Sequence, residues 1–291
     1  VIGTISVGFY PTGIAYDSQN GYMYVTNVIS GTISILSQPI YSINFVENGL
    51  PKGTLWSITL NGVTYSSTTN TITFTEHNGK YSHTIESPIS GGFGIQYITS
   101  QSSGTLTVNG SNITIDISYS TQYYLTMIAS PVSGGTVSPS SGWYNAGSSV
   151  SINAIANYNY EFLSWTGSGR GSYSGTYNDV VIAINGPITE EANFAQLYEL
   201  TFTESGMPLG TTWYVNLSNG ESFSSYTNTI IFYEPNGTYY YTIATNNNEY
   251  APTEYSGTFT VNGANVIINV NFELVTYSII FTESGLPLGT L

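Results

Sequence analysis

The sequence predicts an all-β protein, built as a tandem array of small β-sandwich modules of an Ig-like or β-grasp-like type. Val, Ile, Thr and Tyr are abundant, and apolar residues alternate with polar ones over short stretches. Asn-Gly and Gly-Ser pairs punctuate these stretches about every 8 to 12 residues, which is typical of short strands joined by turns. One long motif also recurs, which is typical of modular arrays.

The recurring motif reads FVENGLPKGTLW from Phe45, FTESGMPLGTTW from Phe202 and FTESGLPLGTL from Phe281. The second copy starts 157 residues after the first, and the third starts 79 residues after the second. Units of about 78 residues divide the chain into an N-terminal segment (1–40), a first repeat (41–120), a middle module (121–197), a second repeat (198–275) and the start of a third repeat (276–291). The joints at 120–122 and 273–275 are short, so we expect a semi-rigid rod that belongs to a longer protein.

Within the first repeat, two hairpins are expected. One runs from Trp56 to Tyr65 around a tight Asn61-Gly62 turn. The other runs from Thr105 to Tyr119 around Asn109-Gly110. The alternating positions predicted to face the core are Ile113, Ile115, Ile117 and Tyr119, and in the second repeat Val266, Ile268, Val270 and Phe272. Trp56 and Trp213 are the expected core anchors.

The composition is unusually poor in charge. Only 7% of residues are charged, with three Lys or Arg against 17 Asp or Glu, and there is no cysteine. Strong acid outside a cell fits this pattern, because protonated carboxylates would leave few ion pairs to lose and few cations to repel one another. A neutral, glycosylated secreted protein is the alternative. Three cations cannot form a basic patch for nucleic acid, and no apolar run reaches the roughly 20 residues that span a bilayer.

Catalysis, cofactors and metals are not expected. The two histidines, His77 and His83, are replaced by Pro235 and Tyr241 in the second repeat. Glutamates recur at Glu47, Glu204 and Glu283, and at Glu76 and Glu234, where we expect them to accept hydrogen bonds from loop amides. Glu190 and Glu191 should point to opposite faces of a strand. The three aspartates are too scattered for calcium, and zinc lacks its usual ligands.

Two kinds of surface site remain. Asn109, Asn112, Asn216 and Asn236 each begin an Asn-x-Ser/Thr triplet and are candidate glycosylation sites. Aromatic residues gather in the middle module and could bind glycans, although alternation predicts that half of them belong to the core: Trp143, Tyr144, Tyr158, Tyr160 and Trp165. A further cluster is Tyr239 to Tyr241.

Three resemblances follow from longer motifs. Residues 1–37, with YMYVTN from Tyr22 and SGTISIL from Ser30, resemble one blade of a YVTN-type β-propeller, known from surface-layer proteins. The middle module, with AGSSVSI from Ala146, YEFLSWTG from Tyr160 and ITEEANF from Ile188, is similar to the divergent internalin-type B-repeat. The repeats at 41–120, 198–275 and 276–291 resemble those of large secreted proteins of thermoacidophilic archaea and the tails of thermopsin-like acid proteases.

These features together predict a non-catalytic, extracellular structural or adhesive segment that acts as a spacer, display or assembly scaffold. Its partners would be other copies of itself or cell-wall glycans. The strand that opens the third repeat, with Tyr277, Ile279 and Phe281 on one face, would pair with another chain and build a filament. The alternative is the non-catalytic, substrate- or wall-binding tail of a secreted acid hydrolase.

Overall fold

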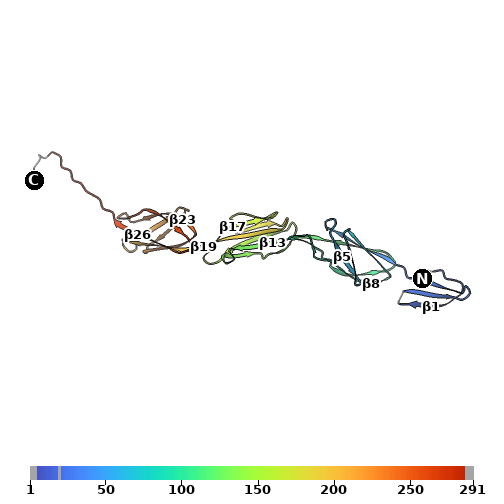
Figure 1. Cartoon of the computed structure of the whole chain (residues 1–291). Coiled ribbons are helices and arrows are strands. Elements are labelled where there is room, and N and C mark those ends of the chain that lie inside the picture. The colour runs from blue at the N-terminus through green and yellow to red at the C-terminus, as the bar shows by residue number, and fades with distance from the viewer. Residues whose placement is uncertain (1–4, 19–20, 286–291) are drawn as a thin grey trace.

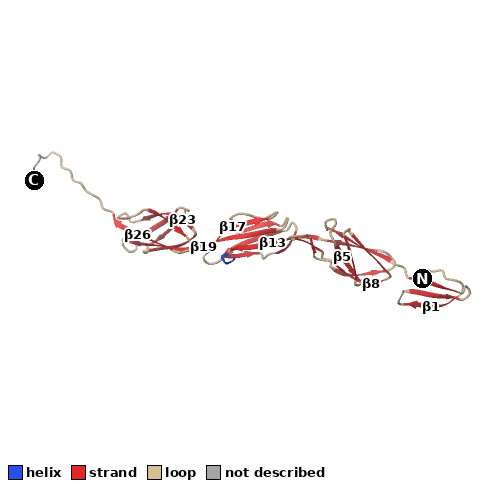
Figure 2. Ribbon diagram, viewed as in Figure 1, coloured by secondary structure: helices blue, strands red, loops and turns tan. Residues whose placement is uncertain are grey.

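The computed structural model describes residues 5–18 and 21–285, so the ends of the N-terminal segment and of the third repeat lie outside the described residues. The fold is all-β as predicted, with 61% of residues in strands and 1% in helix. Figure 1 shows successive β-modules arranged end to end in an extended row, and Figure 2 shows that their regular elements are strands, apart from one short helix.

The N-terminal segment forms a small antiparallel sheet in the order β1-β2-β3. Its strands are β1 (Pro11–Asp17), β2 (Tyr22–Asn27) and β3 (Thr32–Ser37). Val25 is buried, whereas Ile14, Ile33 and Ile35 are each about three-fifths exposed. The blade-like sequence therefore forms three strands, and most of its apolar side chains face solvent.

The first repeat is a sandwich of a four-stranded sheet, β11-β8-β5-β6, and a three-stranded sheet, β12-β4-β7. Its strands are β4 (Tyr41–Asn48), β5 (Trp56–Leu60), β6 (Val63–Ser67), β7 (Thr71–Glu76), β8 (Gly79–Ile85), β9 (Ile89–Ser90), β10 (Ile95–Ile98), β11 (Ser103–Val108) and β12 (Ile113–Ser118). Trp56 is fully buried between the layers, and Ile117 and Tyr119, two of the alternating positions predicted to face the core, belong to the same cluster of buried residues.

The second repeat has the same arrangement, with sheets β21-β20-β23-β25 and β26-β19-β22. Its strands are the C-terminal part of β19 (Ile188–Ser205), with β20 (Trp213–Leu217), β21 (Ser222–Ser225), β22 (Thr229–Pro235), β23 (Gly237–Thr245), β24 (Tyr250–Pro252), β25 (Ser256–Val261) and β26 (Val266–Leu274). Trp213 is fully buried and occupies the place of Trp56.

The middle module has its own core, which includes Leu125, Ile152 and Trp165. Its elements are β13 (Ser120–Ser130), the short 3₁₀ helix η1 (Val132–Gly134), β14 (Gly135–Ser138), β15 (Gly142–Asn145), β16 (Ser149–Ala156), β17 (Tyr160–Ser168), β18 (Asp179–Ala183) and the first part of β19. The sheet β14-β16-β18 packs against the sheet that contains β13, β15, β17 and β19.

The recurring motif is explained by a close backbone approach. Gly49 has φ +105°, and a Cβ there would lie 2.2 Å from the carbonyl oxygen of Tyr119. Gly206 has φ +99°, and a Cβ there would lie 2.1 Å from the carbonyl oxygen of Phe272. Only glycine fits both requirements, because L-residues rarely adopt positive φ and no side chain has room. The glycine of the motif therefore lies where the first strand of each repeat stops pairing with the last strand of the same repeat.

The hairpin at Trp56 is confirmed and the second predicted hairpin is wrong. Asn61 and Gly62 have φ 49° and 84° and connect β5 to β6, as a tight turn requires. In contrast, β11 pairs with β8 in one layer and β12 pairs with β4, in parallel, in the other. The residues from Asn109 to Asn112 cross between layers, because both strands present an apolar face to the same core from opposite sides.

Continuous strands cross both joints. β13 pairs with β10 of the first repeat through residues 120–123, and with β15 and β19 of the middle module. β19 runs for 18 residues, so one strand belongs first to the middle module and then to the second repeat. The expected short joints are thus pieces of sheet, and a nine-stranded sheet extends through all three modules.

One helical element, η1, occurs in the described part of the chain, and it has three residues. No helix found there has the length and hydropathy needed to cross a bilayer.

Candidate binding groove at the first joint

A hollow with a volume of about 710 Å³ lies where the first repeat meets the middle module. The pairing of β10 with β13 positions it, because that pairing holds the 92–94 turn of the first repeat over the sheet of the middle module. The backbone N–H of Tyr124 donates to the carbonyl oxygen of Gly94 at 3.0 Å. A Cβ on Gly94 would lie 2.8 Å from Pro187, so glycine allows this approach.

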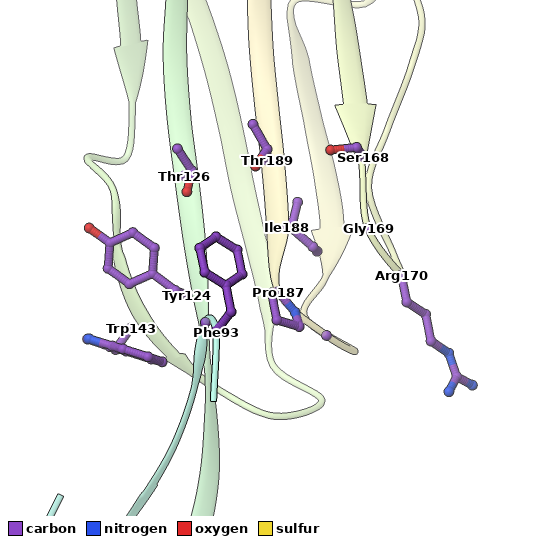
Figure 3. A pocket seen from close by; sticks show the side chains of 12 residues that line it. Phe93, Tyr124, Thr126, Trp143, Ser168, Gly169, Arg170, Pro187, Ile188 and Thr189 are labelled. Carbon is purple, nitrogen blue, oxygen red and sulfur yellow. The ribbon is translucent and has the colours of Figure 1, made fainter. Parts of the chain in front are cut away.

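Aromatic side chains form one side of the groove. Tyr124 and Trp143 meet edge to face, with ring centroids 5.1 Å apart and an interplanar angle of 73°. Phe93 stands at the centre of the opening, and its side chain is 97% exposed (Figure 3). Trp143 is 39% exposed. Such exposure is unusual for large rings, and exposed apolar clusters mark interaction sites in many proteins.

The groove is also lined by a small set of polar side chains. Thr126, Ser168 and Thr189 contribute hydroxyl groups, while no Asp or Glu lines it. Arg170, the only arginine of the chain, lies at the opposite rim, and its side chain extends away from the aromatic rings (Figure 3). The groove therefore offers stacking surfaces at one side and a cation at the other.

A polar ladder fixes the joint beside the groove. The side-chain amide of Gln96 donates to the Oε1 of Gln122 at 2.7 Å, and the amide of Gln122 donates to the Oδ1 of Asn145 at 3.0 Å. Gln96 belongs to the first repeat and Asn145 to the middle module, so this ladder joins the two modules and limits their relative movement.

The aromatic residues named from the sequence divide as alternation predicts. Trp165 is 1% exposed and belongs to the core, whereas Tyr158 is 87% exposed and lies outside the groove. Tyr144 and Tyr160 are partly buried. Of the five, only Trp143 lines the groove at the first joint. Phe93 and Tyr124 were not predicted, because the groove exists only where two modules meet. A phenylalanine between glycines, GGFG from Gly91, is the one sequence signal for it.

Both histidines make contacts within the first repeat or with the segment just before it. His83 packs edge-on against Phe45 at 5.3 Å, and its counterpart Tyr241 packs in the same way against Phe202 at 5.1 Å. Burial lowers the pKa of His83. The Nδ1 of His77 lies 3.1 Å from the carbonyl oxygen of Pro39.

The recurring glutamates differ in their contacts. The Oε2 of Glu47 accepts from the backbone N–H of Leu50 at 3.1 Å, as predicted for a loop acceptor. In Glu204 the Oε2 is buried without a partner. Glu190 is fully buried, accepts from the backbone N–H of Tyr173 at 2.7 Å, and has its pKa raised by burial. Its neighbour Glu191 is partly exposed.

The candidate glycosylation sites have different local roles. The Oδ1 of Asn112 accepts from the N–H of Ser42 at 2.9 Å, and the Oδ1 of Asn236 accepts from Gly263 at 2.7 Å. Asn265 and Asn78 make the matching bonds in the other repeat without a sequon, so these asparagines have structural roles. Asn216 accepts from the hydroxyl of Ser222 at 2.6 Å. Asn109 is exposed in the crossing between layers, and glycosylation at all four remains a prediction.

The residues of the predicted assembly strand are far from the groove. Tyr277, Ile279 and Phe281 are 83%, 78% and 92% exposed, and residues 275–285 belong to no strand (Figure 1). Among the residues that the structure describes, no group of three or more His, Cys, Asp or Glu could hold a metal ion.

The fold defines a tandem β-module protein, and the groove between two of its modules is a candidate binding surface. Residues 125–197 match the divergent InlB B-repeat domain, as predicted for the middle module. No curated protein matches the chain.

Several solved structures are similar over most of the chain. The Bacillus anthracis TIE protein is 12% identical with a TM-score of 0.29, over 88% of this chain and 58% of that one. The major pilin subunit BcpA of Bacillus cereus is 8% identical with a TM-score of 0.33, over 81% and 100%. The pilus adhesin SpaC of Lactobacillus rhamnosus GG is 10% identical with a TM-score of 0.29, over 89% and 47%. The chain therefore spans about half the length of two of these proteins.

Proposed function

We propose that this chain is a non-catalytic, extracellular scaffold segment that spaces or displays other parts of a cell-surface assembly. The observation that carries the proposal is the continuity of β13 and β19 across the joints, since a strand shared by two modules resists bending where a loop would not. The match of the middle module to a B-repeat and the low content of cations support the same role. We also propose that the modules keep the boundaries at residues 40, 120, 197 and 275.

A finer proposal concerns assembly. Ile279 and Phe281 occupy the motif positions of Ile43 and Phe45, which are fully buried in the first repeat. A segment with these side chains is suited to complete a sandwich, with partner strands equivalent to β7 and β12. We propose that another copy of the chain supplies those strands by strand exchange, in which this segment takes the place of that copy's β4, so that copies join end to end.

The assembly proposal predicts that the double variant Ile279→Asp, Phe281→Asp remains monomeric at concentrations where the wild-type chain forms oligomers. Charged side chains at two core positions would prevent insertion, because burying an unpaired carboxylate is costly. Analytical ultracentrifugation over a concentration series measures the effect. Ile267→Asp, at a site 72% exposed on β26, is the matched control and should assemble normally. A wild-type chain that is monomeric throughout, or a double variant that assembles equally well, would contradict the proposal.

The groove supports a second candidate function, the binding of an anionic sugar chain, as expected for a wall- or substrate-binding tail. Tyr124 and Trp143 provide faces on which sugar rings can stack. Arg170 lies away from them, so a ligand that reaches both must be extended. Since no acid lines the groove, a sulfated polysaccharide is the occupant that best fits its charge.

This second candidate predicts that Trp143→Ala and Arg170→Gln each weaken binding to dextran sulfate at pH 4 by about tenfold, which corresponds to about 1.4 kcal/mol. Surface plasmon resonance on immobilised dextran sulfate, with unsulfated dextran as reference, measures this. Tyr158→Ala and Lys52→Gln are matched controls outside the groove and should bind like the wild type. Equal losses in the controls would show non-specific attraction and reject the groove as the site.

A further inference from the structure

Three glutamates from two modules converge at the second joint. Glu161 is near the start of β17 in the middle module and pairs with Ala195 of β19. Glu234 is on β22 in the second repeat and pairs with Tyr198 of the same strand. Glu221 lies in the turn between β20 and β21, where its carboxyl group is close enough to act on both of the others. The convergence therefore spans the boundary between the two modules.

The surroundings of Glu234 are unfavourable for a charge. Its side chain is 5% exposed, and its Oε1 is buried without a hydrogen-bond partner in the described structure. The carboxyl group of Glu221 and the hydroxyl of Tyr239 lie near it, and that hydroxyl donates to the carbonyl oxygen of Pro235 at 3.0 Å. Two carboxyl groups so near each other, with that of Glu234 buried, cannot both be ionised at low cost, so a proton is favoured on this pair.

No basic side chain can relieve this repulsion from the second repeat. Arg170 is the last cation, and residues 171–291 contain no Lys, Arg or His. The groups that act on Glu234 are Glu221, Glu161 and Tyr239, of which none is a cation. Neutralisation must therefore come from protons.

We propose that the second joint is an acid-locked hinge: the middle module and the second repeat keep one arrangement while Glu161, Glu221 and Glu234 are protonated, and repulsion between Glu161 and the other two carboxylates loosens that arrangement when all three are ionised. All three glutamates belong to one chain, so the hinge requires no partner molecule. It goes beyond the scaffold role because it makes the stiffness of the rod depend on pH.

The direction of the pH dependence follows from the pKa values. Burial, with the contact to Glu221, raises the pKa of Glu234 from 4.5 to about 7. Burial, followed by the charge of Glu221, also raises the pKa of Glu161. Of the groups that act on Glu234, Glu161 is the one that lies across the joint, and its charge is one cause of the raised pKa. The repulsion across the joint is therefore weak while Glu234 is protonated, and it grows as pH rises through about 7.

The first repeat provides an internal comparison. Glu76 occupies the position of Glu234, but Val63 occupies the position of Glu221, so the paired carboxyl group is missing there. The variant Glu221→Val thus copies into the second repeat a residue that the same fold already accommodates.

The absence of cysteine permits a direct test with spin labels on the full chain. Cysteines replace Val181 on β18 and Ile267 on β26, which are 65% and 72% exposed on strands of the two modules. Distances between the labels are measured by double electron–electron resonance at pH 4 and pH 8. We expect one narrow distribution at pH 4 and a distribution at least twice as wide at pH 8. Glu221→Val and Glu234→Gln should keep the narrow distribution at both pH values.

Two results would overturn the proposal: a wild-type distribution that is equally narrow at both pH values, or variants that broaden at pH 8 as the wild type does. Hydrogen exchange of β20 and β23 at pH 8 shows whether the second repeat itself stays folded, and unfolding of that repeat would also reject a hinge. A distribution that is broad at both pH values would reject the acid lock and would also count against the rigid scaffold.

Discussion

Inserting five Gly/Ser residues between Gln196 and Leu197 should convert the second joint from a fixed connection into a free one. The insertion divides β19 after its pairing with β17 and before its pairing with β22, and it separates Leu197 from the carbonyl oxygen of Asn159, a bond of 2.8 Å. Each module keeps its own portion of the strand. A flexible linker of that length spans about 12 Å on average, so the label distances between the modules should become several times broader at pH 4.

The same insertion between Asn61 and Gly62 is the matched control, since that turn lies within the first repeat and connects β5 to β6. We expect it to leave the distances across the joint unchanged. If the insertion at Leu197 also leaves a narrow distribution, then contacts other than the shared strand fix the joint, and the structural basis of the scaffold proposal is wrong.

Replacing Trp213 by alanine should destabilise the second repeat by about 3 to 5 kcal/mol, the range found for truncating a buried aromatic residue. Trp213 is fully buried, meets Phe272 edge to face at 6.3 Å, and donates its indole N–H to the carbonyl oxygen of Thr227 at 2.8 Å. The variant loses this packing and also leaves a carbonyl oxygen unpaired. A module of this size has little stability to spare, so we expect the second repeat to unfold at low urea concentration.

Hydrogen exchange in a urea series measures the stability of each module separately. Trp56→Ala should have the same effect on the first repeat, because Trp56 is also fully buried and donates to the carbonyl oxygen of Thr69 at 2.7 Å. Trp143→Ala, at a position 39% exposed, should change stability by less than about 1 kcal/mol. Equal effects at Trp143 and Trp213 would contradict the assignment of Trp213 as the core anchor.

The sequence was sufficient for the fold class and for much of each core. Period-two alternation correctly placed Ile117 and Tyr119 in the first core and Val270 and Phe272 in the second. It could not assign strands to layers, because β11 and β12 each present one apolar face to the same core. That is why a crossing between sheets was predicted as a hairpin.

The candidate sites were harder to predict, because they depend on contacts between modules. Trp143 was named from the sequence, but Phe93 reaches the groove only through the pairing of β10 with β13. Glu234 was predicted to accept hydrogen bonds from loop amides, whereas the structure buries its Oε1 without a partner and brings Glu221 close to it. Internal comparison of the repeats identified what they share. Glu161 lies in the middle module, and Glu221 stands where the first repeat has Val63, so the features shared by the repeats could not identify either residue.

Small-angle X-ray scattering of the full chain at pH 4 tests the central claim, that shared strands make the modules one stiff rod. We expect a long, asymmetric pair-distance distribution with a single maximum at the distance of the cross-section. The one extended arrangement in Figure 1 should reproduce this distribution without an ensemble of other arrangements. A shorter, broad distribution that requires an ensemble of bent arrangements between residues 41 and 275 would contradict it.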